Sequence, residues 1–252
     1  LGGTLPGPLG VDPARLGAVD VGDEPLLLAL GGTTAWIARD RAAGARAAVE
    51  AGAGVVILDD GFQNPALVKH LSLLVVDGAV GFGNGRVMPA GPLREPVADG
   101  LARADAVVLM GEDRVGVAAL IGARMPLLRA RLVPDPAAAV ALAGQRILAF
   151  AGIGRPEKFF DTCRAVCAAG GGHVAAAVPF PDHHPYTGAE MDGILTRAAA
   201  LGALPVTTAK DAVRLPPGVR DRVAVLTVRL AWDDPGRLDP LFPDPDPDHG
   251  QA

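Results

Sequence analysis

Aromatic side chains are scarce in this sequence, with two Trp, one Tyr and seven Phe among its 252 residues. Half of the residues are nevertheless hydrophobic (50%), so the core has to be built mainly from aliphatic side chains. A chain of this length can form one large domain or two modest ones, each with a proper core.

Long apolar runs are also missing. None approaches the roughly 20 consecutive apolar residues that a membrane-spanning helix needs, and no signal peptide is recognisable at the N-terminus. We therefore expect a soluble or peripheral cytosolic protein.

Basic residues are in the minority, with 23 Lys and Arg against 28 Asp and Glu and a net charge of −5. This balance does not favour a general nucleic-acid-binding surface, and we expect no nucleic-acid partner. Cysteine is limited to Cys163 and Cys167, which lie on one face of a predicted helix. Buried cytosolic thiols fit this pair better than a disulfide or a metal site.

Short apolar, β-branched runs alternate with helical segments along the chain. The predicted strands span residues 53–58, 73–76, 106–110, 127–133, 146–151, 173–178, 205–208 and 223–231. Strands that alternate with helices favour an α/β fold with parallel sheets. The Pro- and Ala-rich residues 134–144 indicate a boundary. We predict an N-terminal α/β domain over residues 1–140, a smaller α/β domain over 141–236 and a flexible tail over 237–252.

Two carboxylates, Asp59 and Asp60, directly follow the predicted strand 53–58. Ligands of open α/β sheets bind at the carboxyl ends of strands, and a carboxylate placed there in a nucleoside-triphosphate enzyme holds Mg²⁺ against the phosphates. The plainer interpretation is a turn, since Asp and Gly are usual turn residues.

The densest cluster of titratable residues is Asp182-His183-His184, in a loop rich in proline. It fits a catalytic histidine beside a carboxylate, a pair of metal ligands, or exposed polar residues equally well. Lys210, after another predicted strand, suits contact with an anion, whereas Arg214 fits an ordinary helical basic residue. Asp23 can be the cap of the helix that begins near Pro25.

Six segments of the chain resemble tetraacyldisaccharide 4'-kinases, in that family's order. They read VGDEPLLLA, DDGFQ, GFGNGRVMPAGPLREP, AFAGIGRPEKFFDT, FPDHHPY and TTAKDAVRL, and they are spread over about 200 residues. The resemblance implies transfer of phosphate from ATP, with Mg²⁺, to the 4'-hydroxyl of the acylated glucosamine disaccharide 1-phosphate that is a precursor of lipid A. It further implies a P-loop-kinase-like α/β domain joined to a smaller one, and peripheral attachment to the cytoplasmic side of the inner membrane.

The same resemblance assigns roles to individual residues. Asp23 and His183 would form the dyad that removes the proton from the sugar hydroxyl, and Asp59 and Asp60 would hold Mg²⁺. The residues implied in substrate binding or charge stabilisation are Gln63, Arg94, Glu95 and Lys210.

Two departures from the family pattern stand out. Ala209 replaces an acidic residue of the family's TTEKD segment, and no G-x-x-x-x-G-K-[ST] phosphate loop occurs in the 252 residues. We therefore expect the chain to be an N-terminally truncated kinase that is inactive as it stands. Two alternatives stay open: a non-catalytic homologue that binds lipid or nucleotide, and a metal-dependent phosphoesterase of the DHH type.

Overall fold

The structure, a computed structural model, describes residues 3–242 and divides the chain into two compact units. Unit 1 comprises Leu1–Val56 and Pro134–Val228, and unit 2 comprises Ile57–Val133 and Arg229–Ala252. The domain boundaries predicted from the sequence stay a prediction. Most of the predicted flexible tail, from residue 243 onward, lies outside the described residues.

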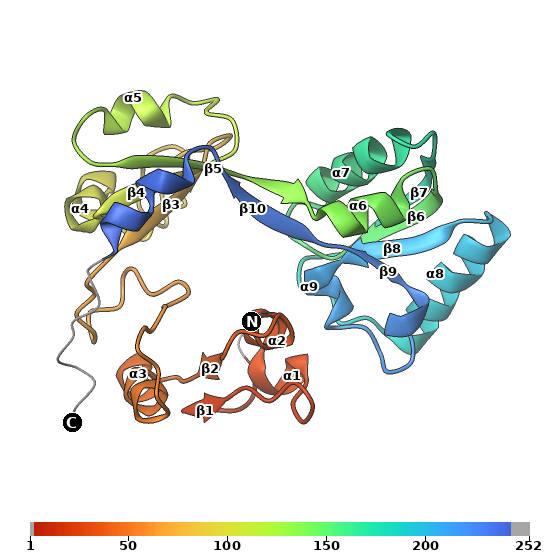
Figure 1. Cartoon of the computed structure of the whole chain (residues 1–252), viewed down its shortest axis with the longest axis horizontal. Helices are drawn as coiled ribbons and strands as arrows, with labels where there is room; N and C mark the ends of the chain where they lie inside the picture. Colours follow the sequence, from red (N-terminus) through yellow and green to blue (C-terminus); the bar gives the residue numbers. More distant parts are fainter. Residues whose placement is uncertain (1–2, 243–252) are drawn as a thin grey trace. The chain divides into compact units, whose positions relative to one another are not determined.

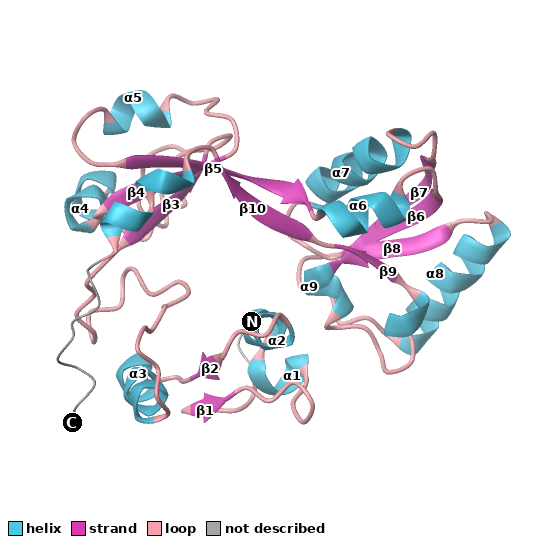
Figure 2. Ribbon diagram, in the orientation of Figure 1, coloured by secondary structure: helices cyan, strands magenta, loops and turns pink. Residues whose placement is uncertain are grey.

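Unit 1 is built on a four-stranded parallel sheet in the order β7-β6-β8-β9 (Figure 2). Its strands are β6 (Arg146–Ala151), β7 (His173–Pro179), β8 (Leu204–Thr208) and β9 (Ala224–Leu226). The first three confirm predicted strands. The predicted strand 223–231 is two strands, since β9 ends at Leu226 and β10 (Val228–Trp232) belongs to the other sheet.

Helices cover both faces of this sheet (Figure 1). Ile147 and Ala149 of β6 pack with α6 (Pro136–Leu142) and α7 (Pro156–Ala168), whereas Leu148 and Phe150 pack with α8 (Gly188–Ala200). Because neighbouring residues of a strand point to opposite faces, a strand buried on both faces reads as one apolar run. The prediction of an α/β fold with parallel sheets is confirmed.

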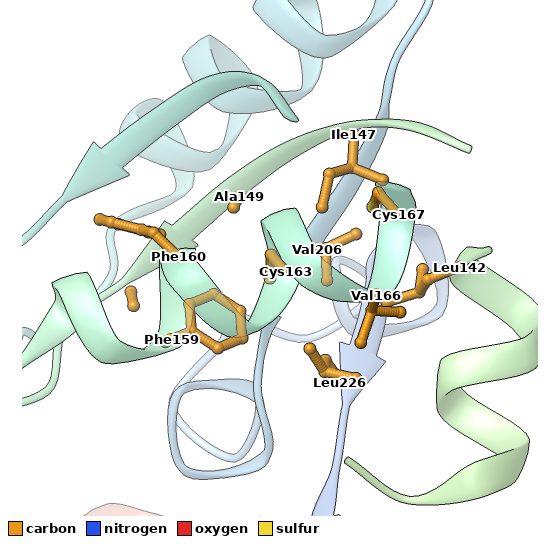
Figure 3. Close-up of a cluster of buried hydrophobic side chains, with 11 residues drawn as sticks. Leu142, Ile147, Ala149, Phe159, Phe160, Cys163, Val166, Cys167, Val206 and Leu226 are labelled. Carbon is orange, nitrogen blue, oxygen red and sulfur yellow. The ribbon is translucent and has the colours of Figure 1, made fainter. Parts of the chain in front are cut away.

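The apolar face of α7 forms the largest part of one core cluster (Figure 3). Phe160, Cys163 and Cys167 are completely buried, and both cysteines are free thiols, as predicted. Burial raises the pKa of Cys163 to about 12, so this side chain acts as a small apolar group.

The N-terminal part of unit 1 contains β1 (Leu9–Gly10), α1 (Ala18–Val21), α2 (Asp23–Leu30), β2 (Trp36–Ile37) and α3 (Arg41–Glu50). Strands β1 and β2 pair antiparallel. Helix α3 begins at Arg41, because the Asp40 carboxylate accepts hydrogen bonds from the backbone of Ala42 and Ala43 and caps it there.

Unit 2 contains a second four-stranded sheet, in the order β10-β5-β4-β3, in which β3, β4 and β5 run parallel. Its strands β3 (Leu73–Asp77), β4 (Ala106–Met110) and β5 (Leu127–Pro134) confirm predicted strands. Helices α4 (Val97–Arg103) and α5 (Val117–Ile121) cover one face, and Trp232, Leu238 and Leu241 pack on the other.

The predicted strand over residues 53–58 does not form. Val55 and Ile57 are 76% and 88% exposed, and Asp59 and Asp60 lie in a turn. A β-branched run becomes a strand only where a neighbouring strand takes up its backbone hydrogen bonds, and within residues 3–242 no strand pairs with this one. The placement of Asp59 and Asp60 at a strand end is therefore wrong.

Helices α7 and α8 have 13 residues each. Within residues 3–242 no helix combines the length and the apolar character that crossing a bilayer requires.

We expect Phe160→Ala to lower the free energy of unfolding by about 3–5 kcal/mol, because it removes a fully buried ring from the α7 cluster and leaves a cavity. Urea unfolding followed by circular dichroism measures the change. The matched control is Glu157→Ala in the first turn of the same helix, where a change within about 0.5 kcal/mol is expected. An equal loss in both variants would contradict the assigned core.

Candidate active site

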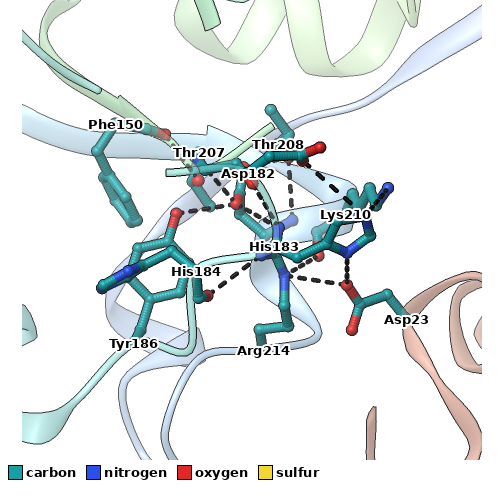
Figure 4. Close-up of polar contacts among 12 residues, drawn as sticks. Asp23, Phe150, Asp182, His183, His184, Tyr186, Thr207, Thr208, Lys210 and Arg214 are labelled. Carbon is teal, nitrogen blue, oxygen red and sulfur yellow. Dashed lines mark hydrogen bonds and ion pairs between the residues drawn. The ribbon is translucent and has the colours of Figure 1, made fainter. Parts of the chain in front are cut away.

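Polar residues gather where the strands β6, β7 and β8 end (Figure 4). Gly152 follows β6, His183 lies in the loop after β7, and Lys210 lies in α9 (Ala209–Ala212) directly after β8. Because these strands are parallel neighbours, their carboxyl ends share one edge of the sheet, which is where such sheets bind ligands.

Asp23, the first residue of α2, meets His183 although the two are 160 residues apart. Its Oδ2 lies 3.1 Å from Nδ1 of the imidazole, and its side chain is only 10% exposed. An ionised carboxylate can only accept hydrogen bonds, so Nδ1 carries the proton and Nε2 of the neutral ring is left with a lone pair. The pair has the arrangement of a general base with its orienting carboxylate.

The backbone holds His183 in an uncommon conformation, with φ at 56°. Its N–H donates to the carbonyl of Gly152 over 3.0 Å, which ties the loop to the end of β6. Gly152 is closely surrounded, since a Cβ there would lie 3.0 Å from both the Pro181 carbonyl and the Tyr186 hydroxyl and 3.2 Å from Oδ1 of Asp211, so a larger residue would have to displace these groups. A non-glycine residue in the left-handed region is typical of functional sites.

Lys210 lies beside the other nitrogen of the imidazole. Its Nζ is 3.5 Å from Nε2 of His183 and 2.6 Å from Oε1 of Glu24. Partial burial pushes the pKa of Glu24 upward, but the hydrogen bond and positive charge of Lys210 outweigh this effect, and the pKa lies below its usual value. The Nε2 edge of the His183 ring, which holds the lone pair, is thus bordered by the Lys210 ammonium and its partner, the Glu24 carboxylate.

Arg214 also pairs with Asp23, with Nε 3.3 Å from the same Oδ2. Its side chain is 6% exposed and also contacts Asp211 at 2.7 Å. Burial, followed by the neighbouring Asp211 carboxylate, raises the pKa of Tyr186, whose hydroxyl donates to Asp211 over 2.8 Å.

His184 points away from this pair and anchors the loop. Its ring stacks on Phe180 at 4.8 Å, and its Nε2 lies 3.0 Å from Oε1 of Glu190. Glu190 and Thr187 form a capping box at the start of α8. Hydrogen bonds from the backbone and hydroxyl of Thr187, and then from His184, lower the pKa of Glu190 to about 2.

A second group of polar residues lies within unit 2. Nη1 of Arg94 contacts both carboxylate oxygens of Asp60, at 2.7 and 2.9 Å, and lies 3.4 Å from Oε1 of Gln63. Gln63 in turn donates to Glu95 over 2.9 Å. Gln63 and Glu95 line an open pocket of about 510 Å³, together with Phe62 and other residues.

Comparison with known proteins identifies the family of this chain. The family model for tetraacyldisaccharide-1-P 4'-kinase matches residues 1–242. A tetraacyldisaccharide 4'-kinase of Rhodospirillum centenum is 66% identical over 100% of this chain and 74% of its own length. The chain belongs to the tetraacyldisaccharide 4'-kinase family.

Further members of the kinase family agree with this assignment. Relatives from Rhodospirillum rubrum and Paramagnetospirillum magneticum are 55% and 56% identical, each over 96% of the chain and over 72% and 73% of their own lengths. The chain thus spans about three quarters of the length of these kinases. No solved structure matches it.

The predicted site residues fall into two groups, one within each unit. In unit 1 the structure brings together Asp23, His183 and Lys210, and in unit 2 it brings together Asp60, Gln63, Arg94 and Glu95. Asp59 is exposed at the same turn as Asp60. Which of these residues act in the reaction stays a prediction.

The metal-binding interpretation of Asp182-His183-His184 is not favoured. Within residues 3–242 no three His, Cys, Asp or Glu side chains are grouped as ligands of one ion. The two ring nitrogens of His183 instead face Asp23 and Lys210, and His184 points to Glu190.

Sequence reasoning missed Glu24 and Arg214 as members of this site. Both lie inside segments that resemble the kinases, next to or four residues after a predicted site residue. Lys210 and Arg214 are four residues apart, a spacing that places both on one side of a helical turn. This spacing could have predicted that Arg214 lies near the site.

We expect thermal stability to fall less steeply on acidification in Glu190→Gln than in the unaltered protein. A carboxyl with a depressed pKa stabilises the fold above its unfolded value, near 4.5, and this contribution is lost as the pH falls toward about 2. The melting temperatures of the two proteins, measured from pH 6 to 3.5, should therefore draw closer toward the acidic end.

The matched control is Asp192→Asn, an exposed residue of the same helix that accepts no hydrogen bond among the contacts of the described residues. Parallel melting curves for Glu190→Gln and the unaltered protein across this pH range would contradict the role given to Glu190.

Proposed function

We propose that the protein transfers the terminal phosphoryl group of ATP to the 4'-hydroxyl of a tetraacylated glucosamine disaccharide 1-phosphate. Membership of the tetraacyldisaccharide 4'-kinase family supports this assignment. The observation that carries it is the Asp23–His183 pair, with Nδ1 held at 3.1 Å and the opposite nitrogen left as an acceptor.

The proposed path of the proton runs through His183. The 4'-hydroxyl gives its proton to Nε2 of His183 as its oxygen forms a bond to the γ-phosphorus, and the bond from that phosphorus to the β-phosphate oxygen breaks. Asp23 keeps the ring oriented and stabilises the imidazolium that results. ADP leaves, and the proton passes from His183 to water.

Lys210 is placed to recognise an anion beside the reacting hydroxyl. Its ammonium lies 3.5 Å from Nε2 of His183 and is held by Glu24, so an incoming phosphate would compete with one carboxylate for it. An ammonium there would also offset negative charge that develops during transfer.

Within unit 2, Gln63, Arg94 and Glu95 are proposed to bind substrate or stabilise charge. Arg94 presents a guanidinium suited to a phosphate oxygen, and Gln63 and Glu95 line the pocket beside it. The ion pair of Arg94 with Asp60 joins side chains that are 58% and 63% exposed, so little free energy opposes its rearrangement.

Asp59 and Asp60 fit a Mg²⁺ ion, because this metal takes one or two carboxylates and completes its shell with phosphate oxygens and water. Both residues lie exposed in one turn, which leaves room for those further ligands. Bound there, the ion would neutralise charge on the phosphates of ATP.

The substrate determines the proposed location. Its acyl chains stay in the bilayer, so we place the protein at the cytoplasmic side of the inner membrane as a peripheral enzyme without a nucleic-acid partner.

We expect Asp23→Asn and His183→Gln each to lower kcat about 10²- to 10⁴-fold with little change in KM for ATP, because both remove proton transfer and leave nucleotide contacts in place. The assay follows transfer of labelled phosphate from ATP to the lipid disaccharide. His173→Gln, an exposed histidine at the start of β7, is the matched control.

The assay is run on residues 1–252 and on the same residues together with any that the gene encodes upstream, because no G-x-x-x-x-G-K-[ST] loop lies in the 252. Absence of transfer in every form would overturn the proposed function. Full activity of His183→Gln would overturn the proposed base.

We expect Asp59→Asn to raise the Mg²⁺ concentration needed for half-maximal activity about tenfold, since it removes one charged ligand. A titration of activity with Mg²⁺ at saturating ATP measures this. Asp99→Asn, on the exposed side of α4, should leave the titration unchanged. An unchanged requirement in Asp59→Asn would remove this residue from the metal site.

A further inference from the structure

Arg214 makes more contacts than an ordinary helical basic residue needs. Its guanidinium bonds the carbonyls of Gly152 and His184 at 3.0 and 3.2 Å and the carboxylate of Asp211 at 2.7 Å, while its Nε lies 3.3 Å from Asp23. It therefore joins the end of β6, the loop of His183 and the helix that carries Asp23 (Figure 4).

Asp211 is the other half of this arrangement. It is completely buried, and its Oδ1 accepts from the backbone of Gly152, the Tyr186 hydroxyl and Arg214 at 2.9, 2.8 and 2.7 Å. The hydroxyl of Thr208 donates to Oδ2 over 2.6 Å. A buried carboxylate with this many donors is rigidly placed, and so is the guanidinium that pairs with it.

We propose that Arg214 and Asp211 are positioning residues for phosphoryl transfer: Arg214 holds the Asp23 carboxylate aimed at Nδ1 of His183, and Asp211 fixes Arg214 and balances its charge. The inference rests on the proposed function, since it assigns how the Asp23–His183 base is set up.

The charge count explains why both residues are needed. Asp23 and Asp211 contribute two negative charges to the buried group and Arg214 one positive charge, so the group is at −1 while His183 is neutral. Uptake of the proton from the substrate brings it to zero. A buried group that becomes neutral on protonation favours the proton transfer, and each charge in it tunes how strongly His183 binds that proton.

Other charged groups face His183 as well. Glu24 on α2 and Lys210 on α9 form their own pair at 2.6 Å, and Asp182 of the same loop lies 4.0 Å from Nε2. These three are 41%, 30% and 52% exposed, so water screens them more than the buried pair.

The shape of the guanidinium explains why residue 214 is an arginine. Its contacts to three backbone or side-chain oxygens on different segments use three separate nitrogens, and a lysine ammonium cannot reach such a spread of acceptors.

The test compares the pH dependence of kcat/KM in Arg214→Met, Asp211→Asn and the double variant, using the full-length gene product. The acidic limb reports protonation of the base in the free enzyme. Loss of the positive charge in Arg214→Met makes His183 easier to protonate, so we expect the limb to move to higher pH by about one unit. Loss of the negative charge in Asp211→Asn should move it to lower pH.

The double variant removes one charge of each sign, so its acidic limb should return close to that of the unaltered protein while kcat stays reduced. Arg214→Lys keeps the positive charge but lacks the planar guanidinium. Its acidic limb should therefore match that of the unaltered protein, while its kcat stays reduced. If Arg214→Met does not fold, the comparison of Asp211→Asn with the double variant decides.

The matched control is Arg164→Met, because Arg164 pairs with Asp161 at the same spacing of three residues, but at an exposed site. It should alter neither the limb nor the rate. Acidic limbs that coincide in Asp211→Asn, the double variant and the unaltered protein would overturn the inference, leaving these residues a structural role alone. Absence of transfer in the unaltered protein would instead contradict the proposed function.

Discussion

A buried negative charge is stable only when cations or hydrogen-bond donors surround it, and Asp23 satisfies this condition with two partners from distant parts of the chain. His183 reaches it from the loop after β7 and Arg214 from the segment after α9, both at Oδ2. Breaking such a buried pair typically costs about 3–5 kcal/mol. The α1–α2 corner, the His183 loop and the end of β8 therefore have to adopt their conformations together.

The glycine before Asp23 shows how the backbone meets this condition. Gly22 has φ at 93° and separates α1 from α2, so the chain turns sharply and α2 begins with the carboxylate already at the sheet edge. A residue with a Cβ is strained in this conformation. The VGDEP segment thus combines a turn that only glycine makes easily with the charged residue that the turn delivers.

The apolar runs of β4, β6 and β8 were sufficient to predict those strands, because each is buried on both faces and its pattern is local. Residues 53–58 have the same local pattern, but a strand also depends on a neighbour, which local pattern does not specify. Asp23 and His183 came from the resemblance, since no periodicity links residues so far apart. Arg214 was given an ordinary role because the distant groups that it contacts, on Gly152, His184 and Asp23, lie on segments that only the fold brings together.

Two arginines, Arg214 in unit 1 and Arg94 in unit 2, differ in a way that matters for ligand binding. Arg214 is enclosed and its partners are fixed, whereas Arg94 lies in an exposed ion pair that competes with water. A guanidinium of the first kind maintains geometry, and one of the second kind can exchange partners.

The left-handed backbone at His183 has a consequence of its own. With φ at 56°, this position favours glycine and asparagine over β-branched residues, irrespective of what the ring does. Selection for a folded protein and selection for a working base therefore act on the same residue through different atoms. A library at this position sorted first for solubility and then for turnover would rank the amino acids in two different orders.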